Sequence, residues 1–107
     1  MIYVVHPLGK SIDLTQAQTY GGLFYVNNRY VYSDEIDDNG KIPFNVVENI
    51  RRAAHKFDPD RDYLLIAGDH LQLVTLASEI SVRKGWYRVL RYDRVAQGYV
   101  PISIFVS

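Results

Sequence analysis

The apolar run Tyr-Leu-Leu-Ile-Ala at residues 63–67 is the feature that most constrains how this chain can fold. It carries no charge, and an uninterrupted apolar run of this length is typical of a strand that is covered on both faces. The turn-forming sequence Asp-Pro-Asp precedes it, and Gly68 and Asp69 follow it directly. The run therefore predicts a central strand of an α/β fold.

A helix is predicted immediately after this strand. Its apolar stripe consists of Leu73, Leu76, Ala77 and Ile80. Asp69, with Gln72 three residues later, fits a capping box at the start, and Gly85 suits the position just past the end. Residues 86–92 then resemble a strand, so the unit predicts a right-handed parallel crossover.

Further elements are predicted on both sides of this unit. They are strands at residues 2–5 and 99–106, a short helix over 11–20, a tight hairpin formed by 23–26 and 29–32, and a helix over 43–57. Asn27 and Asn28 would make the turn of the hairpin, because asparagine tolerates positive φ. Pro101 lacks the donor that a sheet ladder needs, so it predicts an edge strand.

These elements predict a single α/β domain over residues 1–107. We expect a mixed sheet with a parallel βαβ centre, antiparallel edge hairpins and two main helices. Hydrophobic content of 48% and charged content of 22% argue against disorder. The chain has no cysteine, which excludes disulfides and thiolate metal sites.

The first candidate site is the turn formed by Gly68, Asp69 and His70. Open α/β sheets bind ligands beyond the C-terminal ends of their strands, and the free N–H groups of a following helix attract anions. Asp69 could then act as a base or metal ligand and His70 as an acid or phosphate contact. The alternative, which we favour, is that Asp69 caps the helix and His70 is a solvated first-turn residue. The chain contains neither GxGxxG nor a P-loop, and a carboxylate would repel phosphate.

The second candidate site is the basic and aromatic segment at 83–94. Its candidate residues for binding a nucleic acid or a partner are Arg83, Lys84, Trp86, Arg88, Arg91 and Tyr92. Cations would contact phosphates and rings would stack on bases. Strand alternation, however, sends Arg88 and Arg91 to opposite faces. Twelve basic and twelve acidic residues cancel, which disfavours a nucleic-acid partner.

No metal or cofactor is expected. The acidic segment at 34–40 resembles a calcium loop with Gly40 at the sixth position, but that register puts Val46 where the loop needs a bidentate glutamate. We expect a cytoplasmic protein without a membrane partner, because no apolar run approaches the ~20 residues of a bilayer span and no signal-peptide pattern opens the chain.

The C-terminal half resembles small, uncharacterised accessory proteins of tailed bacteriophages. The resemblance is carried by the sequences DPDRDYLLIAGD at 58–69, YRVLRYDR at 87–94 and GYVPI at 98–102. It implies a small protein made in an infected bacterial cytoplasm that binds and redirects a host or viral component. It provides no catalytic residues.

Three functional hypotheses follow. The favoured one is a non-enzymatic accessory protein that binds a host or viral protein, as an interaction module or inhibitor. The second is a small nucleotide- or phosphate-binding protein or enzyme built on the turn at 68–70, although histidines at 6, 55 and 70 do not form a recognisable catalytic set. The third is a nucleic-acid binder using 83–94. A homodimer is expected through an uncovered sheet edge or a tyrosine-rich face.

Overall fold

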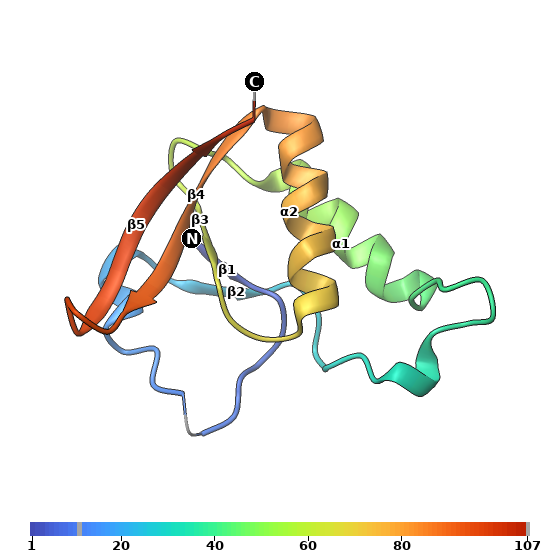
Figure 1. Ribbon diagram of the computed structural model, residues 1–107. Helices are drawn as coiled ribbons and strands as arrows, with labels where there is room; N and C mark the ends of the chain where they lie inside the picture. The colour runs from blue at the N-terminus through green and yellow to red at the C-terminus, as the bar shows by residue number, and fades with distance from the viewer. Residues whose placement is uncertain (11, 107) are drawn as a thin grey trace.

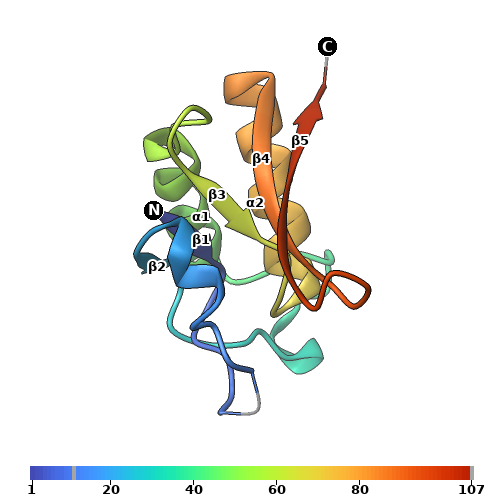
Figure 2. The ribbon, with the colours of Figure 1, turned by 90° about the vertical axis from the view of Figure 1, so that its left-hand side faces the viewer.

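The computed structural model describes residues 1–10 and 12–106 and contains a five-stranded mixed sheet with both α-helices on one face (Figures 1 and 2). The strands are β1 (Ile2–Val4), β2 (Leu23–Tyr25), β3 (Tyr63–Leu65), β4 (Trp86–Asp93) and β5 (Gly98–Phe105). Their order is β2-β1-β3-β4-β5, with parallel pairing throughout except between β4 and β5. The predicted fold class, with its parallel βαβ centre and two main helices, is confirmed.

The two helices begin and end where local sequence signals indicated. α1 (Phe44–Lys56) follows Pro43, and α2 (His70–Lys84) follows Asp69, whose side chain accepts the N–H of Leu71. Gly85 ends α2 in the left-handed conformation, with φ of 80°. The buried residues of α1 are Val46, Ile50, Ala53 and Ala54.

Both faces of the sheet are buried, by different means. On one face Tyr3, Leu64 and Val89 pack against α1 and α2. On the other face Ile2, Val4, Leu65 and Leu90 form a second cluster with Leu14 and the buried Ala17. The segment between β1 and β2, including the 3₁₀ turn η1 (Ala17–Tyr20), supplies this second cover without an α-helix. Coverage on both faces explains why the central strands are apolar without alternation.

The hairpin predicted around Asn27 and Asn28 is wrong. β2 pairs parallel with β1, and the ladder continues as Val26 and Asn27 donate their N–H groups to Val4 and Val5. Residues 29–32 form no strand. The Asn27 side chain is buried and bonded, so it serves tertiary structure and does not form an exposed turn.

The helix predicted over 11–20 is reduced to η1 at its C-terminal end. Residue 11 lies outside the described residues. Asp13 Oδ1 accepts the N–H and the hydroxyl of Thr15, at 2.9 and 2.6 Å. This local bonding holds a turn near the start of the segment that was predicted to be helical.

Tyr3 provides a pH test of the helix-covered core. Its ring packs edge-on against Phe24 and Phe57, with centroids 4.9 and 5.0 Å away. Burial, and secondarily the charge of Asp62, raise the pKa of Tyr3 from 10.0 to about 12. A raised pKa means that folding favours the neutral phenol, so this stabilisation is complete below pH 10 and is lost as the pH rises toward about 12.

We therefore expect Tyr3→Phe to reduce the loss of unfolding free energy between pH 10 and about 12, the range between the two pKa values. Urea unfolding at a series of pH values, followed by circular dichroism, measures this. The wild-type curve should fall more steeply than that of the variant. Parallel curves would show that ionisation of Tyr3 contributes nothing.

Candidate functional site

The C-terminal ends of β1 and β3 lie side by side where two connections diverge. After β1 the chain crosses one face of the sheet to reach β2, whereas after β3 it enters α2 on the other face. Sheets of this type bind ligands at such a point. Gly68 and Asp69 lie here, together with His6 from the end of β1.

Gly68 is held tightly against the end of β1. Its φ is +96°, and a Cβ at this position would lie 2.7 Å from Val5 Cγ2 and 3.1 Å from His6 Nε2. The close backbone approach that glycine permits is therefore used by the protein's own first strand.

Asp69 is buried, and its carboxylate accepts three hydrogen bonds from the chain. Oδ1 accepts the N–H of Leu71, whereas Oδ2 accepts the N–H of Val31 and the side-chain amide of Gln72, all at 3.0 Å. The capping role predicted for Asp69 is confirmed. The carboxylate also ties the start of α2 to the loop after β2.

His6 completes the other side of this turn. Its Nε2 accepts the N–H of Asp69 at 3.0 Å, and its Nδ1 lies 2.8 Å from the carbonyl oxygen of Pro7. Because a peptide N–H can only donate, Nε2 is unprotonated in this arrangement and Nδ1 donates to Pro7. The ring packs edge-on against Tyr30, with centroids 5.8 Å apart.

A chain of amides extends this network to α1. Gln72 donates to the carbonyl of Arg29 at 2.8 Å and accepts from Asn27 at 3.1 Å. Asn27 also donates to the carbonyl of Val46 and accepts from Asn49 at 2.9 Å. Within residues 1–10 and 12–106, no buried side-chain nitrogen or oxygen lacks a partner. The network thus acts as a polar lock joining β1, α1, α2 and the loop at 27–31.

The polar lock was only partly visible in the sequence. The Asp69 and Gln72 spacing pointed to a cap, but Gln72 bonds the Asp69 carboxylate, while the N–H of Asp69 goes to His6. The role of Asn27 was missed because the pair Asn27 and Asn28 after an apolar run resembles a turn. His70 is exposed beside the lock. Ligand binding at Gly68, Asp69 and His70 stays a prediction.

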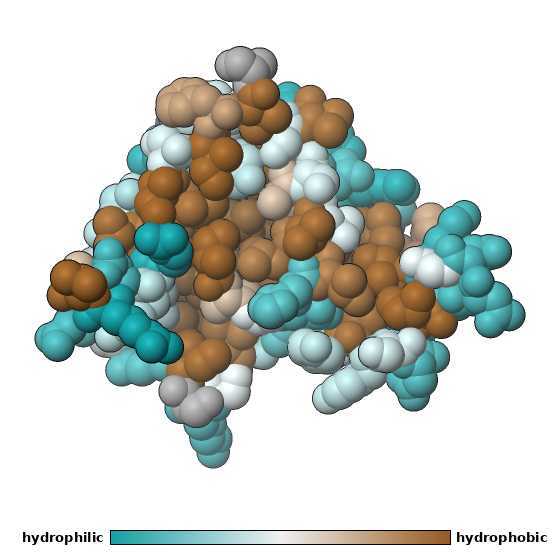
Figure 3. All heavy atoms as spheres, viewed as in Figure 1, coloured by the Kyte–Doolittle hydropathy of each residue, from teal (hydrophilic) through white to brown (hydrophobic). Residues whose placement is uncertain are grey.

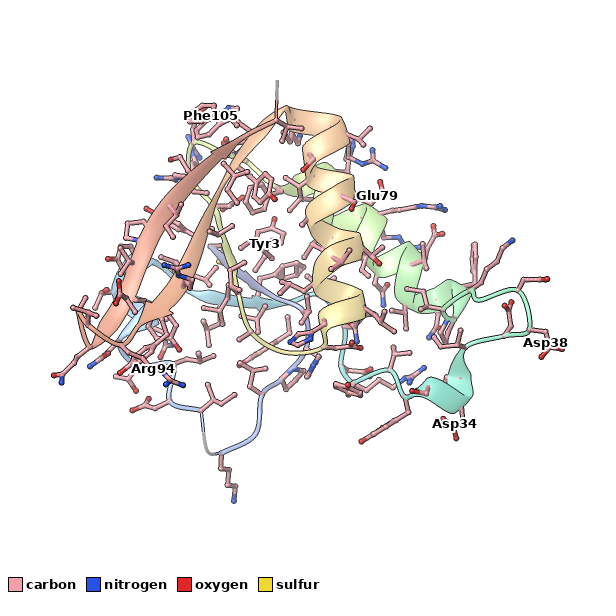
Figure 4. The ribbon with its side chains drawn as sticks, viewed as in Figure 1. Tyr3, Asp34, Asp38, Glu79, Arg94 and Phe105 are labelled. Carbon is pink, nitrogen blue, oxygen red and sulfur yellow. The ribbon has the colours of Figure 1, made fainter. Side chains whose placement is uncertain are left out.

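The structure divides the basic and aromatic segment. Arg83 lies 3.5 Å from Glu79 on α2, and Lys84 donates to the carbonyl of His55 at 3.3 Å (Figure 4 labels Glu79). Arg91 is exposed on the sheet face opposite to Arg88, as strand alternation requires. These cations therefore do not form one surface.

Arg88 is used inside the fold. It donates to the carbonyl of Pro59 at 3.0 Å and to the Tyr63 hydroxyl at 3.1 Å, and its guanidinium lies 4.2 Å from the Tyr63 ring centroid. Trp86 and Tyr92 share this face but pair with β5, on Phe105 and Tyr99 respectively. Binding of nucleic acid or a partner by this segment stays a prediction.

A groove of about 690 Å³ lies between the loop at 35–43 and the first turns of α1 and α2. Its apolar lining consists of Ile42, Pro43, Phe44, Val47 and Leu71. Phe44 is 74% exposed and Leu71 is 48% exposed. In Figure 3, hydrophobic side chains gather over this part of the surface, between α2 and the loop.

The outer wall of the groove is held by hydrogen bonds within the loop. Asp37 accepts the N–H groups of Asn39 and Lys41 at 2.9 and 2.8 Å. The acidic side chains of Asp34 and Asp38 extend away from the helices (Figure 4). The N–H of Tyr32 first, and then Arg29, hold the pKa of Glu35 below its usual value.

The groove was missed at the sequence level, although a signal existed. Phe44 lies outside the buried stripe of α1, which begins at Val46. A large aromatic residue outside the buried face of an amphipathic helix is either an isolated exposed residue or part of a contact surface. Only the packing of the loop against α1 and α2 shows that Phe44 lines a groove.

Two smaller hollows lie near the ends of the strands. One, of about 490 Å³, is lined by asparagines 27, 28, 45 and 49. The other, of about 460 Å³, lies between Asp13 and the pair Tyr92 and Tyr99. Burial first, then Asp13 and Tyr92, raise the pKa of Tyr99.

Among residues 1–10 and 12–106, no group of three or more His, Asp or Glu side chains is placed to hold a metal ion. No α-helix in this part of the chain has the length and apolar character needed to cross a membrane.

Comparison with known proteins gives one family. A family model described as Phage Pam3 gp32-like protein matches residues 2–106. The resemblance seen in the C-terminal half thus extends over nearly the whole chain. No curated protein and no solved structure shows a significant match.

Proposed function

We propose that this chain, which belongs to the family of Phage Pam3 gp32-like proteins, is an accessory protein that binds a host or viral protein in the infected cytoplasm. The groove beside Phe44 is the contact surface in this proposal. The exposed ring of Phe44 is the observation that carries it.

Phe44 has the properties of an anchor residue. It is 74% exposed, lies on the first turn of α1, and shares the groove lining with Leu71. Covering a phenylalanine side chain is worth about 2 kcal/mol, so the free protein leaves substantial binding energy unused. Exposed aromatic residues in a shaped apolar hollow are typical of interaction sites.

The groove fits a short apolar or amphipathic segment of a partner protein. Its floor is apolar, while the rim carries both signs of charge, with Lys41 and Arg51 as cations and Glu35 and Asp37 as anions. A mixed rim around an apolar centre is the usual anatomy of a protein interface. A highly charged polymer would find no single-sign surface here.

The test compares three immobilised forms of the protein in a bacterial lysate, with and without phage infection. Phe44→Asp places a charge in the groove. Val82→Asp is the matched control, because Val82 is 86% exposed on α2 and does not line the groove. A partner bound by the wild type and the control should be lost by Phe44→Asp.

Calorimetry with the purified partner then gives the magnitude. We expect the affinity to fall about 100-fold in Phe44→Asp, which corresponds to about 3 kcal/mol, and to be unchanged in Val82→Asp. Circular dichroism checks that both variants are folded. Equal retention of the partner by all three forms would contradict a role for the groove.

The other two hypotheses have distinct outcomes in solution. A nucleotide that shifts amide resonances only at 68–72 would indicate a ligand at the polar lock. Salt-sensitive retention of DNA or RNA that Arg88→Ala and Arg91→Ala together abolish would indicate a nucleic-acid surface.

A further inference from the structure

β5 is an edge strand with an open outer side (Figure 2). The N–H of Ile66 donates to the carbonyl of Leu90, so the even-numbered residues of β4 bond toward β3 and the odd-numbered ones toward β5. With Leu90 opposite Pro101 in the register, the backbone groups of Pro101, Ser103 and Phe105 point outward. The prediction that Pro101 marks an edge strand is confirmed.

Apart from Pro101, whose missing N–H removes one donor from this edge, β5 carries little of the usual protection against pairing. Residues 98–106 contain no charged side chain, whereas natural edge strands commonly carry lysines or other charges. Phe105 is 71% exposed and Val106 is 54% exposed. Phe105 is held ready by stacking on Trp86, with centroids 5.6 Å apart and an interplanar angle of 10° (Figure 4 labels Phe105).

We propose that β5 pairs antiparallel with β5 of a second copy of this chain, with Ser103 at the two-fold axis. The sequence Pro-Ile-Ser-Ile-Phe at 101–105 is apolar and nearly symmetric about that serine. In this register Ile102 faces Ile104 of the second copy, and Pro101 faces Phe105. Every apolar side chain thus meets an apolar side chain.

The backbone groups fit the same register. Ser103 exchanges two backbone hydrogen bonds with Ser103 of the second copy. The N–H of Phe105 donates to the carbonyl of Pro101 in the second copy, and this bond does not require the N–H that proline lacks. At the other end the Tyr20 hydroxyl already donates to the carbonyl of Tyr99, at 3.3 Å. This contact occupies the outward-facing carbonyl of Tyr99, two residues before Pro101. It therefore favours pairing that is centred on Ser103.

The expected affinity of the dimer depends on the charges near the paired strands and on the area that they bury. Like charges directly opposite each other destabilise strand pairs, and the paired segment has none. Arg88, beside Ser103 on β4, is bonded to Pro59 and Tyr63 of its own chain. A strand pair of this length is a small interface, and interfaces below about 1,200 Å² form weak or transient complexes, so we expect a micromolar dissociation constant.

Cross-linking tests the register directly. The chain has no cysteine, so Ser103→Cys introduces a single thiol. Facing residues in such a pair have Cα atoms about 5.5 Å apart, which a disulfide can span. Diamide, which accepts the two electrons and two protons of the thiols, should convert this variant to a covalent dimer.

Pro101→Cys is the matched control on the same edge. In the proposed register the two introduced thiols lie four residues apart along the strands, about 14 Å, so no disulfide should form. Efficient cross-linking of Ser103→Cys alone supports the proposal. Equal cross-linking of both variants, or of neither, overturns it.

Sedimentation equilibrium provides the second test without any thiol. The wild type should show a monomer–dimer equilibrium, and Phe105→Lys should weaken it about 100-fold or more, since it places a charge on the edge. Val95→Lys is the control, because Val95 is 95% exposed in the β4–β5 turn and away from the paired segment. A monomeric wild type, or a dimer that persists unchanged in Phe105→Lys, overturns the proposal.

Discussion

Replacing Asp69 with alanine is expected to lower the free energy of unfolding by about 4 kcal/mol. The substitution removes the cap of α2, worth about 1 kcal/mol. It also leaves the N–H of Val31 and the amide of Gln72 without their shared acceptor in a buried site, at about 1–3 kcal/mol each. Urea denaturation of wild type and variant measures the difference.

Two variants control this prediction. Asp69→Asn keeps one carbonyl oxygen as an acceptor, so its free energy of unfolding should lie between those of the wild type and Asp69→Ala. Asp60→Ala removes an exposed aspartate from the turn before β3 and should change stability by less than about 0.5 kcal/mol. If Asp69→Ala proved as mild as Asp60→Ala, the polar lock would not stabilise the fold.

Gly68→Ala should cost about 3 kcal/mol, for two separable reasons. A residue other than glycine is strained at φ of +96°, and the added Cβ would lie 2.7 Å from Val5 Cγ2. Neither Val5, fully buried in the core, nor the backbone of β1 can move away easily.

Gly40→Ala separates the two contributions. Gly40 also has a positive φ, +78°, but nothing lies within 4 Å of a Cβ placed there. Its cost, about 1–2 kcal/mol, measures backbone strain alone. Equal losses at the two positions would show that the close approach of Gly68 to β1 is not important for stability.

These two large effects also bear on function. Asp69 and Gly68 stabilise the fold and do not line the groove. The folded molecules of their variants should therefore bind the partner with wild-type affinity, and total binding should fall only as the folded fraction falls. If Asp69→Asn stayed folded but no longer bound a nucleotide that the wild type binds, the turn at 68–70 would instead be a ligand site. We expect the opposite for Phe44→Asp, which should lose partner binding and nearly keep its free energy of unfolding.

The central unit of the fold was predictable because its signals are local. The uncharged run at 63–67, the Asp69 cap and the terminal Gly85 act within a few residues of one another. The same holds for α1 after Pro43 and for the edge position of Pro101, since each depends on the geometry of proline itself.

The N-terminal segments were mispredicted because distant contacts decide them. Asn27 looks like a hairpin turn in isolation, but its amide bonds Gln72, 45 residues away. The segment before Tyr20 forms no α-helix because it lies over the second face of the sheet, where Ala17 and Leu14 pack on β1 and β3. Tertiary packing outweighs local preferences of this size.

The sequence by itself determined the class of fold, the two helices and their ends, and the absence of charge along β5. Only the tertiary structure decided that β2 pairs parallel with β1, that Asp69 is enclosed by bonds from three parts of the chain, and that Phe44 lines a groove. The physical reason is the range of the interactions. Caps, turns and apolar periodicity act over a few residues, whereas burial of a carboxylate or exposure of a ring depends on which distant segments pack around it.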